Sequence, residues 1–242
     1  DLDYVGLNHL SWVRHFRING ADKTDDLLNT FIDQAHEEWD DEAICSNMRA
    51  AMRSLHMFLN GYLQYFYSTD AALAKIKRKG KTRGEEVVEI EASLFEKYKQ
   101  KELNEKPPEL SKRGGAHYST AAFHLIDAIE NDAQNRQIVC CRNNGAVPTF
   151  DDDVSVEVPA IIGKDGATAI PQSAPEPNIR GLMQNIKAYE TLSVKAAVTG
   201  DREAAFQALL EHPLTPDADG CRKLLDELLE INREHLHGTF FG

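Results

Sequence analysis

Residues 154–158 read Val-Ser-Val-Glu-Val, so that apolar side chains alternate with polar ones. This period of two is typical of a strand that buries one of its faces. A turn is expected at residues 163–166 and a short returning strand at residues 167–170. A further strand is predicted upstream at residues 137–141, of which 138–141 are apolar. Short strands that are joined by turns favour an antiparallel sheet.

Most of the remaining chain has the apolar periodicity of amphipathic helices. The predicted helices cover residues 24–39, 44–58, 85–100, 178–198, 201–211 and 218–237, with one more helix after residues 114–120. A loop is expected at residues 102–113. Because helices and strands do not alternate regularly, a doubly wound parallel sheet is disfavoured. We therefore predict an α+β fold, a helix-rich domain with a small antiparallel sheet.

The first strand is predicted to extend over residues 4–18 and to end at a turn, Asn-Gly at residues 19–20. On such a strand His9 shares one face with Leu7 and Ser11. Two interpretations of His9 remain open. It is either a core histidine that is held by hydrogen bonds or a metal ligand, because a neutral imidazole binds Mn, Fe or Zn.

Composition and charge exclude several classes of protein. The 242 residues are 42% hydrophobic and 27% charged, as in soluble globular proteins. The formal net charge of −12 argues against general nucleic-acid binding, because an acidic surface repels phosphates. No apolar run approaches the ~20 residues of a membrane-spanning helix, and no signal peptide is expected. The four cysteines form no CxxC pair and favour a reduced, cytoplasmic protein.

Several common cofactor and catalytic motifs are absent from the sequence. No two glycines are separated by a single residue, so there is no GxGxxG dinucleotide loop. The GxSxG, HExxH and P-loop motifs are also missing. A nucleotide cofactor would therefore need phosphate contacts from another segment, and this chain by itself is expected to have no appreciable affinity for NAD.

Two polar segments are candidates for a site. Two glycines at residues 114–115 precede Tyr118, which is expected in the first turn of a helix, where the partial positive charge of the helix N-terminus would stabilise a phenolate. The alternative is a buried tyrosine that packs against the start of the helix. Arg142 directly follows an apolar strand. It could bind a phosphate through two hydrogen bonds, or extend into solvent from a polar turn.

Two other segments are unusual in composition. The segment 62–67 contains four aromatic residues, whose helical spacing favours a place in the core over a sugar-binding platform. Residues 75–83 include six basic residues and are expected to form a solvated helix end and loop.

Taken in order, six segments resemble glycoside hydrolase family four, the NAD- and metal-dependent glycosidases. These are Gly-Leu-Asn-His at residues 6–9, residues 60–67, 115–119 and 143–146, Val-Glu-Val-Pro at residues 156–159, and the helix at residues 181–190. The resemblance extends over about residues 4–236. In that family an NAD-binding Rossmann domain precedes the Gly-Leu-Asn-His segment. The whole chain, residues 1–242, thus resembles the C-terminal substrate-binding and catalytic domain of these lactate/malate dehydrogenase-like enzymes, without the Rossmann domain.

The resemblance implies roles for four residues and assigns none to NAD binding. It places a single metal ligand in this chain, so the chain by itself is expected to bind a metal weakly or not at all. His9 would bind the divalent metal, Tyr118 would remove the proton at sugar C2, Asn8 would bind the substrate and Arg142 would bind its phosphate. The implied reaction is NAD-dependent oxidation at C3, proton abstraction at C2, elimination and addition of water. The family is an exception to the scheme in which two carboxylates cleave the glycosidic bond.

The resemblance also implies a substrate class and a setting. It favours a cytoplasmic 6-phospho-β-glucosidase that acts on a phosphorylated disaccharide or β-glucoside, with NAD and Mn²⁺ as cofactors of the complete enzyme. A homo-oligomer, a dimer or a tetramer, is expected. Two alternatives remain. One is a 6-phospho-α-glucosidase or α-galactosidase of the same family, and the other is a non-catalytic assembly module.

Overall fold

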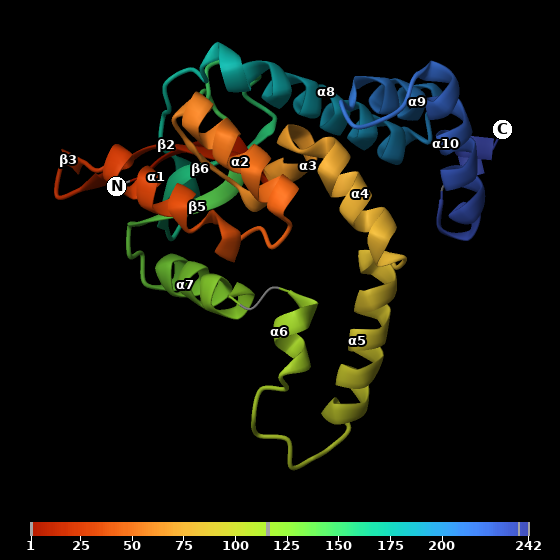
Figure 1. Cartoon of the computed structure of the whole chain (residues 1–242), viewed down its shortest axis with the longest axis horizontal. Coiled ribbons are helices and arrows are strands. Elements are labelled where there is room, and N and C mark those ends of the chain that lie inside the picture. The colour runs from red at the N-terminus through yellow and green to blue at the C-terminus, as the bar shows by residue number, and fades with distance from the viewer. Residues whose placement is uncertain (1, 115–116, 237, 242) are drawn as a thin grey trace. The chain divides into compact units, whose positions relative to one another are not determined.

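The computed structural model describes residues 2–114, 117–236 and 238–241 (Figure 1). The chain divides into two compact units. Unit 1 comprises residues 1–69, 138–160 and 168–242, and unit 2 comprises residues 70–137 and 161–167. Among the described residues, no helix is both long enough and apolar enough to cross a membrane.

Seven short strands form the predicted sheet. They are β1 (Leu2–Leu7), β2 (Leu10–Ile18), β3 (Ala21–Asp22), β4 (Phe58–Leu59), β5 (Asn135–Arg142), β6 (Ser155–Gly163) and β7 (Gly166–Ala169). Their order is β3-β2-β1-β6-β5, while β4 pairs with β2 and β7 pairs with β6. Strand β2 is antiparallel to β1, β3 and β4, and β1 is antiparallel to β6. The predicted antiparallel sheet is therefore confirmed.

The prediction of one strand over residues 4–18 is wrong, because the chain reverses at residues 8–9. Leu7 pairs with Leu10, so the turn between β1 and β2 contains only Asn8 and His9. His9 has a φ of 63°, in the left-handed region that residues other than glycine rarely adopt. His9 therefore lies exposed at the tip of a hairpin and shares no strand face with its predicted neighbours.

The predicted turn at residues 19–20 is confirmed. Asn19 and Gly20 have φ values of 51° and 82°, and Ile18 pairs with Ala21 across them. Positive φ at both central residues is the requirement of a type I′ hairpin turn, which explains the choice of Asn-Gly at this place.

Unit 1 contains six α-helices among its described residues. They are α1 (Thr24–Asp33), α2 (Glu42–Leu55), α3 (Gln64–Tyr67), α8 (Pro177–Thr199), α9 (Arg202–Glu211) and α10 (Ala218–Ile231). Four 3₁₀ turns accompany them, at Ala35–Glu37, Gly61–Leu63, Arg233–His235 and Gly238–Phe241.

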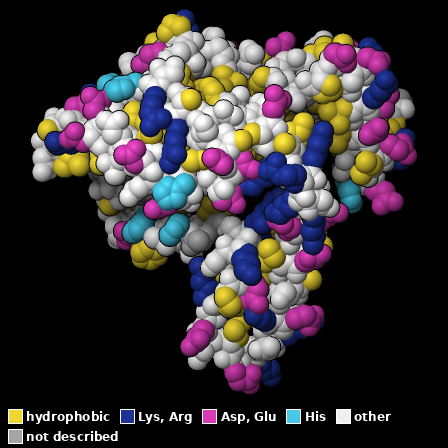
Figure 2. All heavy atoms as spheres, in the orientation of Figure 1, with side chains coloured by type: hydrophobic (Ala, Val, Ile, Leu, Met, Phe, Trp, Pro, Cys, Tyr) yellow, Lys and Arg dark blue, Asp and Glu magenta, His cyan; other side chains and the backbone are white. Residues whose placement is uncertain are grey.

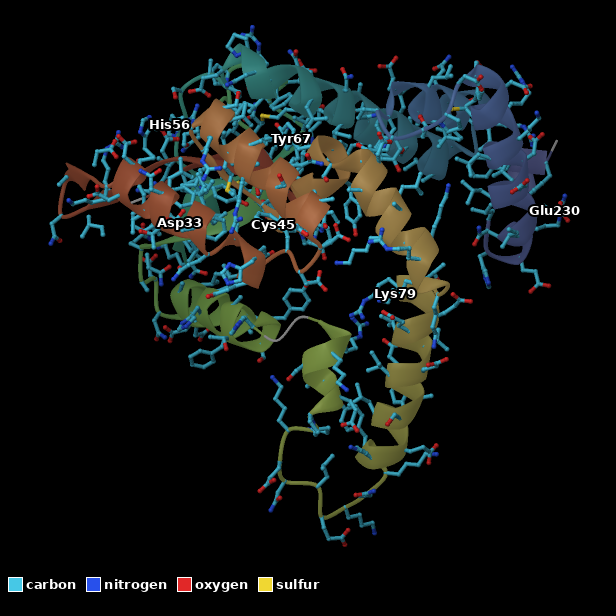
Figure 3. The ribbon with its side chains drawn as sticks, viewed as in Figure 1. Asp33, Cys45, His56, Tyr67, Lys79 and Glu230 are labelled. Carbon is cyan, nitrogen blue, oxygen red and sulfur yellow. The ribbon has the colours of Figure 1, made fainter. Side chains whose placement is uncertain are left out.

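Three of these helices end before their predicted positions. The helix predicted over residues 218–237 ends at Ile231 and is followed by a 3₁₀ turn at Arg233–His235. The helix predicted over residues 24–39 ends at Asp33 and continues only as a 3₁₀ turn. Helix α2 ends at Leu55, because His56 adopts a φ of 58° in the left-handed conformation that commonly ends helices (Figure 3). Residues after His56 then form β4 and pair with β2 instead of extending the helix.

The core of unit 1 lies where the hairpin packs against the neighbouring helices. Its buried side chains come from β1 and β2 on one side and from α1, α2 and the turn at residues 61–63 on the other: Val5, Leu7, Leu10, Trp12, Leu28, Ile32, Ile44, Met48, Met52 and Leu63. A further buried cluster joins α8, α9, α10 and the C-terminal turn. The core covers the strand residues on both sides of the turn, while Asn8 and His9 at the tip are exposed.

Unit 2 is mainly helical. It contains most of α4 (Thr69–Lys79), together with α5 (Arg83–Tyr98), α6 (Glu109–Arg113) and α7 (Tyr118–Glu130). Helix α6 lies inside the predicted loop at residues 102–113, so that prediction is wrong for its last five residues. Ion pairs to α5 explain the difference. Glu109 pairs with Lys97 of α5 at 2.5 Å, and Arg113 pairs with Glu91 of α5 at 2.8 Å.

The basic segment at residues 75–83 forms the end of α4 and the start of α5, as predicted. Lys79 and Lys81 form ion pairs of 2.6 and 2.5 Å with Glu86 and Glu89 of α5. Basic and acidic side chains are accordingly interspersed over this part of the surface (Figure 2). Carboxylates compensate these cations, so this segment offers no uniformly basic surface for nucleic acid.

Candidate functional site

The tip of the β1–β2 hairpin carries His9 beside an aromatic residue that sequence reasoning assigned to the core. The ring centroids of His9 and Tyr62 are 4.6 Å apart, with an angle of 51° between the ring planes. Tyr62 is 52% exposed. Its phenolic oxygen forms no hydrogen bond with another described residue. An imidazole and an available phenol therefore share one exposed surface of unit 1.

The aromatic segment thus has two kinds of residue. Leu63 is fully buried, as a core residue should be, whereas Tyr62 and Tyr65 are exposed and have ring centroids 6.3 Å apart. The interpretation of the whole segment as core is wrong for these two tyrosines. The signal that could have identified them is Asn60-Gly61, which favours a turn over a continuous helix.

Asn60 fixes the turn on which Tyr62 lies. The side-chain oxygen of Asn60 accepts a hydrogen bond of 3.0 Å from the backbone N–H of Tyr62 and caps the 3₁₀ turn. A Cβ at Gly61 would lie 2.4 Å from a carboxylate oxygen of Glu38, which is the far end of a flexible side chain and can move aside. The cap from Asn60 is therefore what holds the backbone at Tyr62.

Arg142 lies at the same end of the sheet as the hairpin tip. Residue 142 ends β5, and the backbone N–H of Asn143 donates to the carbonyl oxygen of Val154, just before β6 begins. Strand β6 pairs with β1 through Glu157 and Gly6, close to the turn. The topology thus places Arg142 two strands from the hairpin, about 10 Å at the usual strand spacing.

The guanidinium of Arg142 is exposed, and its Nε donates to the carbonyl oxygen of Asp152 at 3.3 Å. One edge of the guanidinium thus binds backbone while the planar fork remains available for an anion. Both interpretations from the sequence are compatible with this position, so phosphate binding by Arg142 stays a prediction.

Asn143 shapes the loop that follows Arg142. It is fully buried, and its Nδ2 donates to the carbonyl oxygens of Val147, Phe150 and Asp151 at 3.0 to 3.1 Å. Its Oδ1 accepts from the backbone N–H of Val147 at 2.7 Å. The segment that resembles the family at residues 143–146 therefore has a structural function in this loop.

We expect Asn143→Ala to lower the free energy of unfolding by about 2 to 3 kcal/mol, because buried backbone groups lose their partner. Urea unfolding followed by circular dichroism measures the loss. Asn29→Ala, at an exposed position of α1, is the control and should change stability by less than about 0.5 kcal/mol. Equal stability of the two variants would contradict the assignment of a structural function to Asn143.

Tyr118 is the first residue of α7, which confirms its predicted place in the first helical turn. Its side chain is 70% exposed, so the alternative of a buried, packing tyrosine is wrong. Residues 115 and 116 of the adjacent glycine segment lie outside the described residues. Tyr118 belongs to unit 2 and His9 belongs to unit 1. The role of Tyr118 as a base stays a prediction.

His9 is suited to be one ligand of a divalent metal. Its imidazole is exposed at the hairpin tip and forms no hydrogen bond or ion pair with another described residue. Within the described ranges, no group of three or more His, Cys, Asp or Glu side chains could hold a metal ion. The four cysteines are free, and Cys45 and Cys221 are buried. The role of His9 as a metal ligand stays a prediction.

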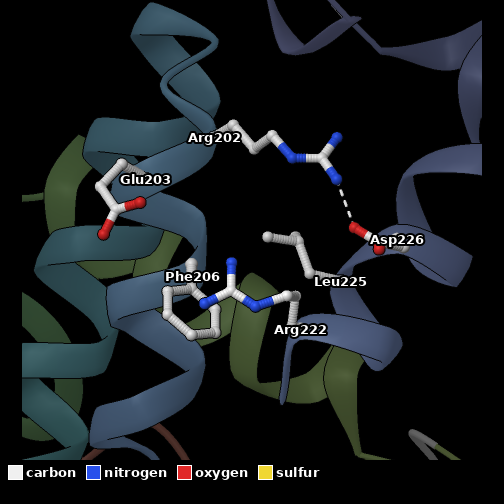
Figure 4. Close-up of a pocket in the computed structure, with 6 residues that line it drawn as sticks. All are labelled: Arg202, Glu203, Phe206, Arg222, Leu225 and Asp226. Carbon is white, nitrogen blue, oxygen red and sulfur yellow. Dashed lines mark hydrogen bonds and ion pairs between the residues drawn. The ribbon is translucent and has the colours of Figure 1, made fainter. Parts of the chain in front are cut away.

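A pocket of about 340 Å³ lies between α9 and α10 (Figure 4). Arg202 forms an ion pair with Asp226, and the guanidinium of Arg222 lies 4.6 Å from the ring centroid of Phe206. Glu203 also lines the pocket. Two carboxylates balance two guanidinium groups here, so the pocket has no net charge with which to select an anion.

The fold and the motif at the hairpin tip now identify the class of protein. Residues 4–215 match the Family 4 glycosyl hydrolase C-terminal domain. The chain belongs to this family of glycosidases, which confirms the resemblance inferred from the sequence.

Three individual relatives show which enzymes of the family the chain is similar to. A probable 6-phospho-beta-glucosidase of Bacillus subtilis is 33% identical, over 99% of this chain and 55% of the relative. The 6-phospho-beta glucosidase of Thermotoga maritima, solved with manganese, NAD+ and glucose-6-phosphate, is 33% identical with a TM-score of 0.83, over 98% of this chain and 54% of its own. A 6-phospho-alpha-glucosidase of Leptotrichia buccalis is 28% identical, over 96% of this chain and 54% of the relative. The chain thus spans about half the length of these relatives.

Proposed function

We propose that the chain is the C-terminal part of a 6-phospho-β-glucosidase that hydrolyses phosphorylated β-glucosides with NAD and Mn²⁺. The observation that carries this proposal is the exposed His9 beside the available phenol of Tyr62, in a chain of family four. Specificity for the β-anomer is supported by the identities, 33% to the β-specific relative from Bacillus subtilis and 28% to the α-specific one. The alternatives are an α-specific enzyme of this family and a non-catalytic assembly module.

Two polar groups at one end of the sheet suit a phosphorylated sugar. Asn8 is exposed next to His9 at the hairpin tip and can donate to and accept from sugar hydroxyls. Arg142, two strands away, can bind the 6-phosphate through its planar guanidinium. Together they would orient the ring of the sugar with its reacting carbons near the imidazole and the phenol.

When bound, NAD and the divalent metal supply hydride transfer at C3 and polarisation of the resulting ketone. The ketone acidifies the neighbouring C2 hydrogen, which a phenolate in this chain can remove. His9 would be one of the residues that hold the metal. No pair of carboxylates is needed for this reaction.

Two phenols compete for the role of base. Tyr118 is the candidate that the sequence predicts, at the start of α7. Tyr62 is the candidate that the geometry favours, because its ring contacts the proposed metal ligand and its oxygen is available. A base must be within hydrogen-bond reach of the proton it removes, and the contact of Tyr62 with His9 supports a place for its phenol beside the metal ligand. We therefore infer that Tyr62 is the base.

We further propose that the enzyme is cytoplasmic and forms a homo-oligomer. Phosphorylated sugars are present where uptake systems deliver them, inside the cell, which supports the first of these points. The function itself is tested with the complete protein by comparing hydrolysis of 6-phospho-β-glucosides and 6-phospho-α-glucosides, with and without NAD and Mn²⁺. Hydrolysis of the α-anomer alone, or of neither anomer, would contradict the proposal.

We expect Arg142→Ala to raise KM for a 6-phospho-β-glucoside about 10- to 100-fold, because hydrogen bonds to a charged group are worth ~1.5–3 kcal/mol. Steady-state kinetics of the complete enzyme measures the change. The matched control is the same glucoside without its phosphate, for which the variant and the parent should have similar kcat/KM. An equal loss on both substrates would mean that Arg142 does not bind the phosphate.

A further inference from the structure

A continuous series of hydrogen bonds joins β6 to the turn that carries Tyr62. Glu157 of β6 accepts from the hydroxyl of Tyr4 in β1, and the hydroxyls of Tyr4 and Ser11 are 2.6 Å apart. The side-chain N–H of Asn60 donates to the hydroxyl of Ser11 at 3.3 Å. The backbone N–H of Asn60 donates to the carbonyl oxygen of Ser11 at 3.1 Å. Three strands and one turn thus meet at these side chains.

In each side-chain hydrogen bond of this series, the donor lies toward Asn60 and the acceptor lies toward Glu157. Glu157 as a carboxylate can only accept, so it takes the single hydroxyl hydrogen of Tyr4. The Ser11 hydroxyl is then free to donate to the oxygen of Tyr4 and to accept from Asn60. Because the oxygen of Asn60 accepts from the N–H of Tyr62, its nitrogen must face Ser11. Burial and the bond to Glu157 raise the pKa of Tyr4, so its phenol stays protonated and donating.

Ser11 is well placed to couple the hairpin tip to the turn. It is 1% exposed and lies opposite Gly6, only two residues after His9. A Cβ at Gly6 would lie 2.3 Å from the Cβ of Ser11, so the two strands approach closely there. A change at Ser11 therefore affects both its own strand and the capping residue Asn60.

We propose that Ser11 and Asn60 are positioning residues that hold the phenol of Tyr62 against the imidazole of His9. Neither residue needs to touch the sugar. Ser11 fixes the hairpin side of the pair, Asn60 fixes the turn, and Glu157 orients both through Tyr4. This inference rests on the proposed function only where it concerns catalysis. The arrangement of the two rings is a property of the chain itself.

The first test uses NMR of the 242-residue chain with labelled histidine. Asn60→Ala and Ser11→Ala should both move the His9 ring signals toward their values in Tyr62→Ala, because the neighbouring aromatic ring is displaced. If Asn60→Ala does not fold, Asn60→Asp is measured in its place, because aspartate keeps an acceptor for the N–H of Tyr62. Asp217→Ala removes another capping side chain, that of α10, and should leave these signals unchanged. Unchanged His9 signals in the Asn60 and Ser11 variants would overturn the proposal.

The second test uses steady-state kinetics of the complete enzyme. Ser11→Ala and Asn60→Ala should lower kcat about 10- to 100-fold with little change in KM, since a small displacement of a reacting group is costly. Asp217→Ala should change neither constant. If the parent enzyme is active and the two variants retain its kcat, the positioning role is wrong. If the parent has no glycosidase activity, the proposed function fails, and the NMR result alone decides the arrangement.

Discussion

In the complete enzyme, Tyr62→Phe is expected to lower kcat about 100- to 10,000-fold, the usual range for loss of a general base. Phenylalanine keeps the ring and its contact with His9, whose centroid is 4.6 Å away, so the fold should be preserved. Only the phenolic oxygen is lost. Because Tyr62 is half exposed and its hydroxyl has no partner among the described residues, little stability should be lost with it.

The specific measurement is exchange of the sugar's C2 hydrogen with deuterated solvent, followed by NMR with NAD and Mn²⁺ present. Tyr65→Phe is the matched control, since its ring belongs to the same aromatic segment and lies 6.3 Å from that of Tyr62. The control should exchange as fast as the parent. Tyr118→Phe separates the two candidates. Loss of exchange in that variant, with normal exchange in Tyr62→Phe, would make Tyr118 the base and overturn our inference.

A second large effect is expected from His9→Asn. Asparagine tolerates the left-handed backbone of this position, where φ is 63°, so the hairpin turn should survive. The imidazole is lost, and with it the proposed metal ligand. We expect the Mn²⁺ concentration for half-maximal activity to rise at least 10- to 100-fold. Mutation of residues that only hydrogen-bond to a metal ligand typically lowers metal affinity by about that factor.

The control for His9 is another histidine of the same hairpin. His15 lies on β2, is exposed, and its Nδ1 lies 3.1 Å from a carboxylate oxygen of Asp22. His15→Ala should leave the Mn²⁺ dependence unchanged. A titration of the complete enzyme with Mn²⁺ after chelation compares the three proteins. If His9→Asn has the Mn²⁺ dependence of the parent, His9 is not a metal ligand.

Local signals in the sequence were sufficient for much of the fold. Alternation at residues 154–158 predicted β6, and Asn-Gly at residues 19–20 predicted a turn whose two positive φ values the structure confirms. The helix predicted at residues 178–198 corresponds closely to α8, which ends at Gly200 in the left-handed conformation. Each of these signals acts within a few residues, so the local sequence is enough to predict these elements.

The errors occur where tertiary pairing overrides local pattern. The apolar residues on both sides of the hairpin tip suggested one long strand, because apolar periodicity does not reveal a reversal at Asn8-His9. Helix α6 formed in a predicted loop because ion pairs to α5 hold it. In both places the deciding partners are distant in the chain or on another strand.

The family, the α+β class and the candidacy of His9 were determined by the sequence itself, because ordered motifs and periodicity are properties of the chain. The contact of His9 with Tyr62 was decided only by the tertiary structure. Those two residues are 53 positions apart, and Ser11 and Asn60 bring them together through hydrogen bonds between strand and turn. No local pattern encodes such a contact, since it depends on how the hairpin packs against the turn at residues 61–63.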